Sequence, residues 1–154
     1  MRVQEEIDFE WAVKKFKPPF EPRCVFLFSG HRIDAPGRPE PRFPADKEKI
    51  AAEAIAKELD ELDARPKDLA LCSGACGGSL LFAEVCLKLG VHLQIRIPFE
   101  ELTYLKNSVT FAGENWRDRY YAAKGNKLTT LFVMPEVLGP TPKDANPYER
   151  NDFW

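Results

Sequence analysis

The segment from Leu71 to Glu84 constrains the fold of this chain more than any other, because it places three glycines between two different apolar patterns. Leu69 to Leu71 is a short apolar run of the kind that forms a buried strand, and a helical pattern begins at Ser79. A strand, a glycine turn and a helix N-terminus in this order are typical of α/β proteins that bind phosphate.

The chemistry of such a turn comes from the backbone. The first turn of a helix leaves N–H groups without partners, its dipole is positive there, and glycine lets an anion approach closely. The pattern predicts phosphate contacts at Gly74, Ala75, Gly77, Gly78 and Ser79. The simpler alternative is a tight turn in which Ser79 is an ordinary N-cap.

Apolar patterns along the chain predict four strands separated by helices. The strands are expected at residues 24–28, 68–72, 91–97 and 128–134, and the main helices at 45–62, 79–89 and 116–124. This alternation favours a parallel sheet with right-handed crossovers. We expect an α/β fold of the Rossmann-like three-layer sandwich type with a mainly parallel sheet. The first run is apolar throughout, as in a central strand, whereas the third alternates and is expected at a sheet edge.

The 154 residues are expected to form one domain with its core in residues 23–134. Residues 1–22 are interpreted as an N-terminal addition with an amphipathic helix, which has Ile7, Trp11 and Phe16 on one side. Residues 135–154 contain four prolines and are expected to be an aperiodic tail. This tail could dock on its own chain, on a second subunit in a homodimer or larger signalling assembly, or continue into a longer protein.

Charge and cysteine content narrow the range of partners. The formal net charge of −2 gives no general attraction to polyanions, which disfavours nucleic acid. No apolar run approaches the roughly 18 residues of a membrane helix, and the charged start is unlike a signal peptide.

Four cysteines in or near apolar patterns indicate reduced thiols and a cytoplasmic location. Cys72 and Cys76 have no second ligand pair with suitable spacing, so no metal site is predicted.

Polar residues follow the first predicted strand, where ligands bind in parallel sheets. Ser29 and Gly30 permit close backbone approach, and Arg32 could hold phosphate bidentately. His31 could donate to phosphate or ribose, or exchange a proton near neutral pH. Both side chains could instead hold the proline-rich loop 31–44 in place. Asp34 could accept from a ribose hydroxyl or pair with a neighbouring arginine.

A second group of candidates precedes the last predicted strand. Ser108 and Arg119 are predicted ligand contacts, with Arg119 reaching a phosphate. Trp116 and Tyr120, four residues apart on a helix, could stack on a base or simply pack against the sheet.

Several short motifs together carry a family resemblance. They are Ser29-Gly30-His31-Arg32-Ile33-Asp34, Arg42-Phe43-Pro44, the glycine turn 73–78, Phe82-Ala83-Glu84, Ile97-Pro98-Phe99, Ser108-Val109 and residues 116–120. In this order and spacing, over roughly residues 23 to 134, the set resembles the SLOG superfamily. These are Rossmann-like domains related to DNA-processing protein A and to the lonely-guy phosphoribohydrolases. The resemblance implies recognition of nucleotides or nucleotide-derived signals and, in some relatives, cleavage of the N-glycosidic bond.

The chain departs from the cleaving relatives after the fourth predicted strand. The lonely-guy enzymes carry a second glycine-rich loop with a glutamate there, whereas this chain has Val133-Met134-Pro135-Glu136-Val137-Leu138-Gly139-Pro140. We therefore expect binding of a nucleotide or nucleotide-derived phosphate ligand as a sensor, with ligand and cofactor identity left open. The alternative is an N-glycosidase with Glu84 or Glu136 as acid/base. Single-stranded DNA binding and a pure interaction module are less favoured.

Overall fold

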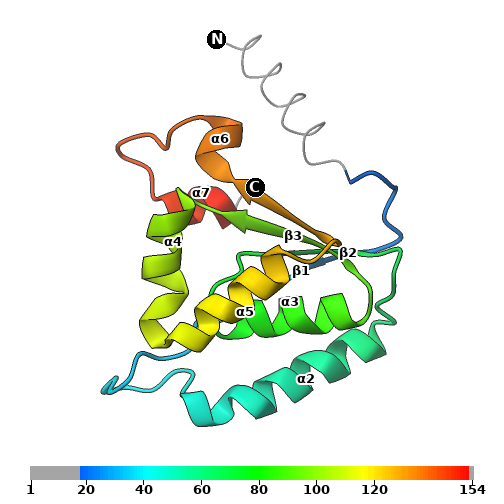
Figure 1. Cartoon of the computed structure of the whole chain (residues 1–154), viewed down its shortest axis with the longest axis horizontal. Coiled ribbons are helices and arrows are strands. Elements are labelled where there is room, and N and C mark those ends of the chain that lie inside the picture. The colour runs from blue at the N-terminus through cyan, green and yellow to red at the C-terminus, as the bar shows by residue number, and fades with distance from the viewer. Residues whose placement is uncertain (1–17, 153–154) are drawn as a thin grey trace.

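A computed structural model of the chain describes residues 18–152 (Figure 1). The predicted amphipathic helix within residues 1–16 and the end of the tail lie outside this range. The four predicted strands are present and form one fully parallel sheet in the order β1-β2-β3-β4. They are β1 (Val25–Leu27), β2 (Leu69–Cys72), β3 (His92–Ile97) and β4 (Thr129–Val133). The parallel α/β class is confirmed.

The crossover helices occupy one face of the sheet. Because each strand lies beside the preceding one, right-handed crossovers place every connecting helix on the same side. Figure 1 shows α2, α3 and α5 together below the sheet. The described strands never reverse their order, so they lack the switch point from which a doubly wound third layer would grow. The connecting helices are η1 (Ala45–Lys47), α2 (Glu48–Glu61), α3 (Gly78–Lys88), α4 (Glu101–Ser108), η2 (Thr110–Ala112) and α5 (Glu114–Lys124).

The prediction that the third strand lies at an edge is wrong, because β3 pairs with β2 on one side and β4 on the other. Its alternation has another cause. Gln94 is only 4% exposed and accepts a 2.9 Å hydrogen bond from the Arg96 guanidinium. Two of the polar residues of β3 thus pair with each other on a sheet face that is at least half-buried, so the alternation does not mark a wet edge.

The expectation of a central first strand is also wrong, since β1 lies at the edge of the sheet. Phe26 packs toward the helices, whereas Val25 and Leu27 are 53% and 76% exposed. An apolar run therefore did not distinguish a strand with two neighbours from a strand with one.

The tail is not aperiodic in the described range. It forms α6 (Met134–Leu138) directly after β4 and α7 (Pro147–Asp152). Asn151 of α7 donates to the backbone carbonyl of Arg96 at 3.2 Å, and Phe99 lies edge-on to Tyr148, with ring centroids 5.4 Å apart. The tail therefore packs against the carboxyl end of β3.

The hydrophobic core lies between the sheet and its layer of helices. Inward residues of the strands meet the apolar face of α3, which is buried along most of its length. The largest buried side chains on the helices that follow β3 are Tyr104, Trp116 and Tyr120. The interpretation of Trp116 and Tyr120 as core residues agrees with this burial.

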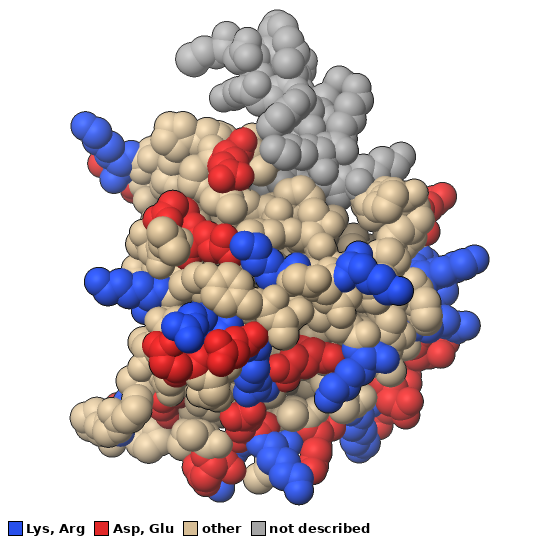
Figure 2. All heavy atoms as spheres, viewed as in Figure 1, with Lys and Arg blue, Asp and Glu red and all other residues tan. Residues whose placement is uncertain are grey.

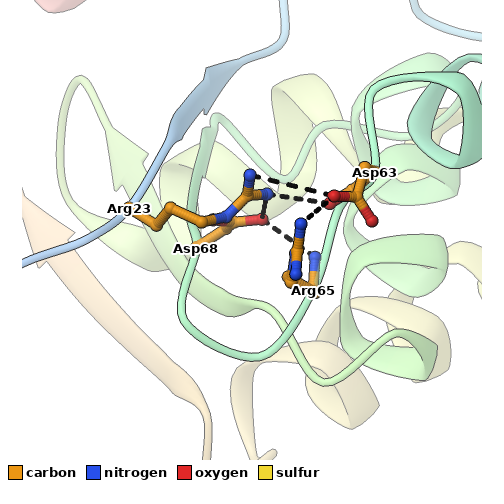
Figure 3. Close-up of polar contacts among 4 residues, drawn as sticks. All are labelled: Arg23, Asp63, Arg65 and Asp68. Carbon is orange, nitrogen blue, oxygen red and sulfur yellow. Dashed lines mark hydrogen bonds and ion pairs between the residues drawn. The ribbon is translucent and has the colours of Figure 1, made fainter.

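An ion pair between the partly exposed Arg23 and the buried Asp68 fixes the start of β1 to the turn before β2 (Figure 3). The Asp68 carboxylate is fully buried and accepts two hydrogen bonds from the Arg23 guanidinium, at 2.9 and 2.7 Å. It also accepts the Arg65 backbone N–H at 2.9 Å. Burial acts to raise the pKa of Asp68, but the hydrogen bonds from Arg23 and Arg65 outweigh it, and the pKa lies below its usual value.

The exterior of the helical layer carries both signs of charge. Figure 2 shows acidic and basic side chains interspersed across the visible face. Such mixing gives a weak net field on this face. Within residues 18–152, no helix combines the length and apolar character needed to cross a membrane.

Candidate functional site

The glycine turn joins β2 to α3, as predicted, but its amides are largely used by the chain itself. The N–H of Gly74 donates to the Ser79 hydroxyl at 2.8 Å, and that of Gly78 to the His31 carbonyl at 3.1 Å. The N–H of Cys76 donates to the carbonyl of Ser108 at 2.9 Å. These three amides are occupied without any ligand. The remaining predicted contacts of the turn, at Ala75, Gly77 and Ser79, stay a prediction.

The loop after β1 explains why this turn needs glycine. Arg32 and Gly77 form an isolated antiparallel bridge, which lays the loop across the start of α3. A Cβ on Gly77 would stand 2.4 Å from the Ile33 nitrogen, and the φ of Gly77 is +92°. A Cβ on Gly74 would meet Ile95 at 3.0 Å. Close packing of one chain segment on another accounts for these glycines.

The proline-rich loop that makes this bridge also lines a cavity. The cavity has a volume of about 330 Å³ and is lined by residues of the segment 31–42 and by Phe111 of η2. The basic members of its lining are His31, Arg32, Arg38 and Arg42. We call this cavity the arginine pocket. Three of its residues, His31, Arg32 and Asp34, were predicted as ligand contacts.

Each arginine in the pocket has a different degree of restraint. Arg32 donates to the Asn107 carbonyl at 2.8 Å, and its guanidinium carbon lies 5.2 Å from the centre of the Phe111 ring. Arg38 donates to the Glu40 carbonyl at 2.8 Å. The Arg42 guanidinium makes no hydrogen bond or ion pair with the described part of the chain. Arg42 is thus the arginine most available to an incoming anion.

Asp34 is the single carboxylate lining the pocket among the described residues. Its Oδ2 accepts the backbone N–H groups of Arg42 and Phe43, at 2.8 and 2.9 Å. Its Oδ1 lies 3.5 Å from Arg38 but has no hydrogen-bond partner in the described chain, although it is buried. The carboxylate therefore shapes the loop with one oxygen and pairs with Arg38 through the other. Pairing with an arginine was one of its two predicted roles.

Arg38, Arg42 and Phe111 were not among the predicted ligand contacts. The signal for the two arginines was present in the alternation of arginine with proline through residues 31–44. Proline restricts the backbone, so this loop holds its arginines at lower entropic cost than a flexible loop would. Phe111 comes from a distant segment, and local patterns carry no information on that proximity.

Glu84 and Arg119, two further predicted residues, bind each other outside the arginine pocket. The Arg119 guanidinium donates to both Glu84 carboxylate oxygens, at 2.6 and 2.7 Å, and to Glu48 at 2.6 Å. Its carbon also lies 4.1 Å from the centre of the Trp116 ring. The hydrogen bond to Glu84 is the main reason that the pKa of Arg119 is raised. The cluster joins α2, α3 and α5, so its contacts are those of a structural tie.

We expect the Glu84→Gln variant to lower the free energy of unfolding by about 1–2 kcal/mol, because one charge of a partly buried bidentate pair is removed. Urea denaturation measures this loss. Glu114→Gln is the matched control, since Glu114 pairs with Arg117 on the exposed side of α5. This control should change stability by no more than about 0.5 kcal/mol. Equal effects of both variants would contradict a structural role for Glu84.

The other predicted residues lie apart from the pocket lining. Ser108 is 1% exposed, and its hydroxyl lies 3.2 Å from the Tyr148 hydroxyl, so it links α4 to the tail. Ser29 and Gly30 are exposed at the end of β1, immediately before the pocket loop. Glu136 is exposed on α6.

The cysteines are free thiols with no grouping that suggests a metal. Burial raises the pKa of Cys72 and Cys76 to about 11, so both are protonated near neutral pH. Within the described residues, no three His, Cys, Asp or Glu side chains gather in a way that could hold a metal ion.

Fold and site together define an α/β domain with a four-stranded parallel sheet and an arginine-lined cavity on the loop after its first strand. No protein-family profile matches the chain, and no curated protein matches it either.

Proposed function

We propose that this domain binds a small phosphate-bearing molecule of the nucleotide class in the arginine pocket, as a recognition or sensor domain. The observation that carries the proposal is the excess of basic side chains in the pocket. Three arginines and a histidine line about 330 Å³ of space together with one carboxylate. Guanidinium groups suit phosphate oxygens, and the volume lies at the lower end of ligand cavities, about 300–1,000 Å³.

Two further features of the pocket favour a nucleotide over phosphate alone. Asp34 lines the pocket, and a carboxylate is an acceptor of the kind that a ribose hydroxyl uses. Phe111, which is 36% exposed, offers an aromatic surface for a base. The resemblance of residues 29–34 and 73–78 to SLOG domains points in the same direction.

In this proposal the phosphate lies against arginine side chains, whereas the sequence pattern placed it on the amides of the glycine turn. The Gly78 amide instead holds the loop that carries the arginines, by donating to the His31 carbonyl. Glu84 and Glu136 do not line the pocket, so the proposal is recognition of the ligand without its cleavage.

Isothermal titration of the full chain against AMP, ATP, ADP-ribose, cyclic nucleotides and inorganic phosphate tests the proposal. Arg42→Gln should weaken binding at least about tenfold, because one charge-assisted hydrogen bond contributes about 1.5–3 kcal/mol. The fold should be unaffected, since the Arg42 guanidinium holds no partner in residues 18–152.

Arg117→Gln is the matched control, because it removes an exposed arginine from α5, outside the pocket lining. It should leave affinity unchanged. Phe111→Ala should weaken the binding of nucleotides more than the binding of inorganic phosphate, which loses only the support that the ring gives to Arg32. Absence of binding below millimolar concentration across the panel would refute the proposal. Equal losses of affinity in Arg42→Gln and Arg117→Gln would show that the ligand does not bind in the arginine pocket.

A further inference from the structure

The sheet has an apolar surface on the side away from its crossover helices. In parallel neighbours the paired residues share a face, so the register places Val25 with Leu69 and His92, and Leu27 with Leu71 and Gln94. Leu71 is half-buried, whereas Val25 and Leu27 are 53% and 76% exposed. We call the surface of Val25, Leu27 and Leu71 the open sheet face.

Parallel sheets in α/β proteins are normally covered on both faces. The helices α2, α3 and α5 cover one face, and the α6–α7 tail packs against the far end of β3. Within residues 18–152, these elements leave aliphatic side chains of β1 and of the adjoining part of β2 at least partly exposed. The side chains there are aliphatic, so burying them is favourable.

The chain enters the described structure at this same face. Phe20 packs on His92, with ring centroids 4.4 Å apart, and His92 points to the face that carries Leu69 and Val25. Residues 1–17 are therefore tethered a few residues from the open sheet face. A short tether gives an effective concentration of about millimolar, which favours the chain's own segment over a second copy at micromolar concentration.

The sequence of this segment fits such a surface. Val3, Ile7 and Trp11 follow each other at intervals of four residues among acidic and basic residues. This spacing predicts one apolar side on a helix. Seventeen helical residues would extend about 25 Å, whereas two strand spacings amount to only about 10 Å, so the segment is long enough.

We propose that residues 1–17 pack on the open sheet face as an amphipathic helix, with Ile7 and Trp11 against Val25 and Leu27. The N-terminal segment would then cover the sheet face opposite the crossover helices as a third layer. The occupant is thus a segment of the same molecule.

Hydrogen exchange of the full chain at about 10 µM tests this. An isolated helix of this length is marginal in water, so protection of these amides reports packing. Amides of residues 4–13 should exchange at least about tenfold more slowly than in an unfolded chain. Leu27→Glu should abolish this protection while the amides of β2 and β3 keep theirs, because the Leu27 side chain is already mostly exposed.

Leu102→Glu is the matched control, since Leu102 is 73% exposed on α4 and lies away from this face. It should leave the protection intact. Unprotected amides in the unmodified chain would overturn the proposal, as would protection that survives Leu27→Glu. Protection that grows with chain concentration alongside a dimer in sedimentation would also overturn it and assign the face to a second copy.

Discussion

Gly77→Ala should lower the free energy of unfolding by more than about 3 kcal/mol, because strain and overlap act together at this position. Its φ of +92° is rarely adopted by residues with a side chain. A Cβ there would lie 2.4 Å from the Ile33 nitrogen and 2.9 Å from the Arg32 carbonyl carbon. Both are backbone atoms, so no side-chain rotation relieves the overlap.

Gly37→Ala separates the two causes. Gly37 has a similar φ of +77°, but a Cβ there would meet nothing within 4 Å. Its variant should lose only the conformational contribution, about 1–2 kcal/mol. Urea denaturation of the two variants measures the difference. If Gly77→Ala were no worse than Gly37→Ala, the contact between the loop and the helix would be far looser than described.

The same variant links the glycine turn to the arginine pocket. The bridge between Arg32 and Gly77 fixes the start of the loop that supplies the pocket arginines. Displacement of this loop in Gly77→Ala should therefore also weaken binding of the proposed ligand. The measurement is made without denaturant, under conditions where the variant is still folded. The turn acts on the pocket through position and need not touch the ligand.

Local patterns predicted the elements of this fold but not their order across the sheet. The helix of residues 79–89 and the strand of residues 91–97 correspond closely to α3 and β3, because hydrophobic periodicity reports which face of an element is buried. Periodicity does not report which strand lies beside which. The hydrogen-bonded pair of buried Gln94 and half-buried Arg96 gave β3 the pattern of an edge strand. Conversely, the apolar run of β1 gave an edge strand the pattern of a central one.

The site shows the same limit. The turn at residues 73–79 was located correctly between a strand and a helix, since glycine, strand and helix signals are all local. Its amides bind the His31 and Ser108 carbonyls, which are far away in the sequence, and no local signal reports such partners. Phe111 joined the pocket in the same way. Residue types indicated the chemistry, and the tertiary contacts determined which residues remain available for it.

Asp68→Asn should lower the free energy of unfolding by about 1.5–3 kcal/mol at neutral pH, the amount associated with hydrogen bonds to a charged group. The carboxylate is fully buried. It accepts hydrogen bonds from the Arg23 guanidinium and the Arg65 N–H (Figure 3). Asparagine keeps the size of the side chain but removes its charge. Asp63→Asn is the control, because the Asp63 side chain is 65% exposed in the same cluster and should contribute little.

The pH dependence of this loss distinguishes an ion pair from simple packing. The pKa of Asp68 lies below its usual value in the folded protein, because the hydrogen bonds from Arg23 and Arg65 outweigh the effect of burial. A carboxylate with a depressed folded pKa contributes stability above its unfolded pKa, about 3.9, and loses it as the pH falls through the folded value. The difference in free energy of unfolding between the unmodified chain and Asp68→Asn should therefore be constant between about pH 6 and pH 8. It should shrink steadily below about pH 4. A difference that persists unchanged into strong acid would show that the asparagine disturbs packing, because protonation of the Asp68 carboxyl would then have removed no stabilising contribution.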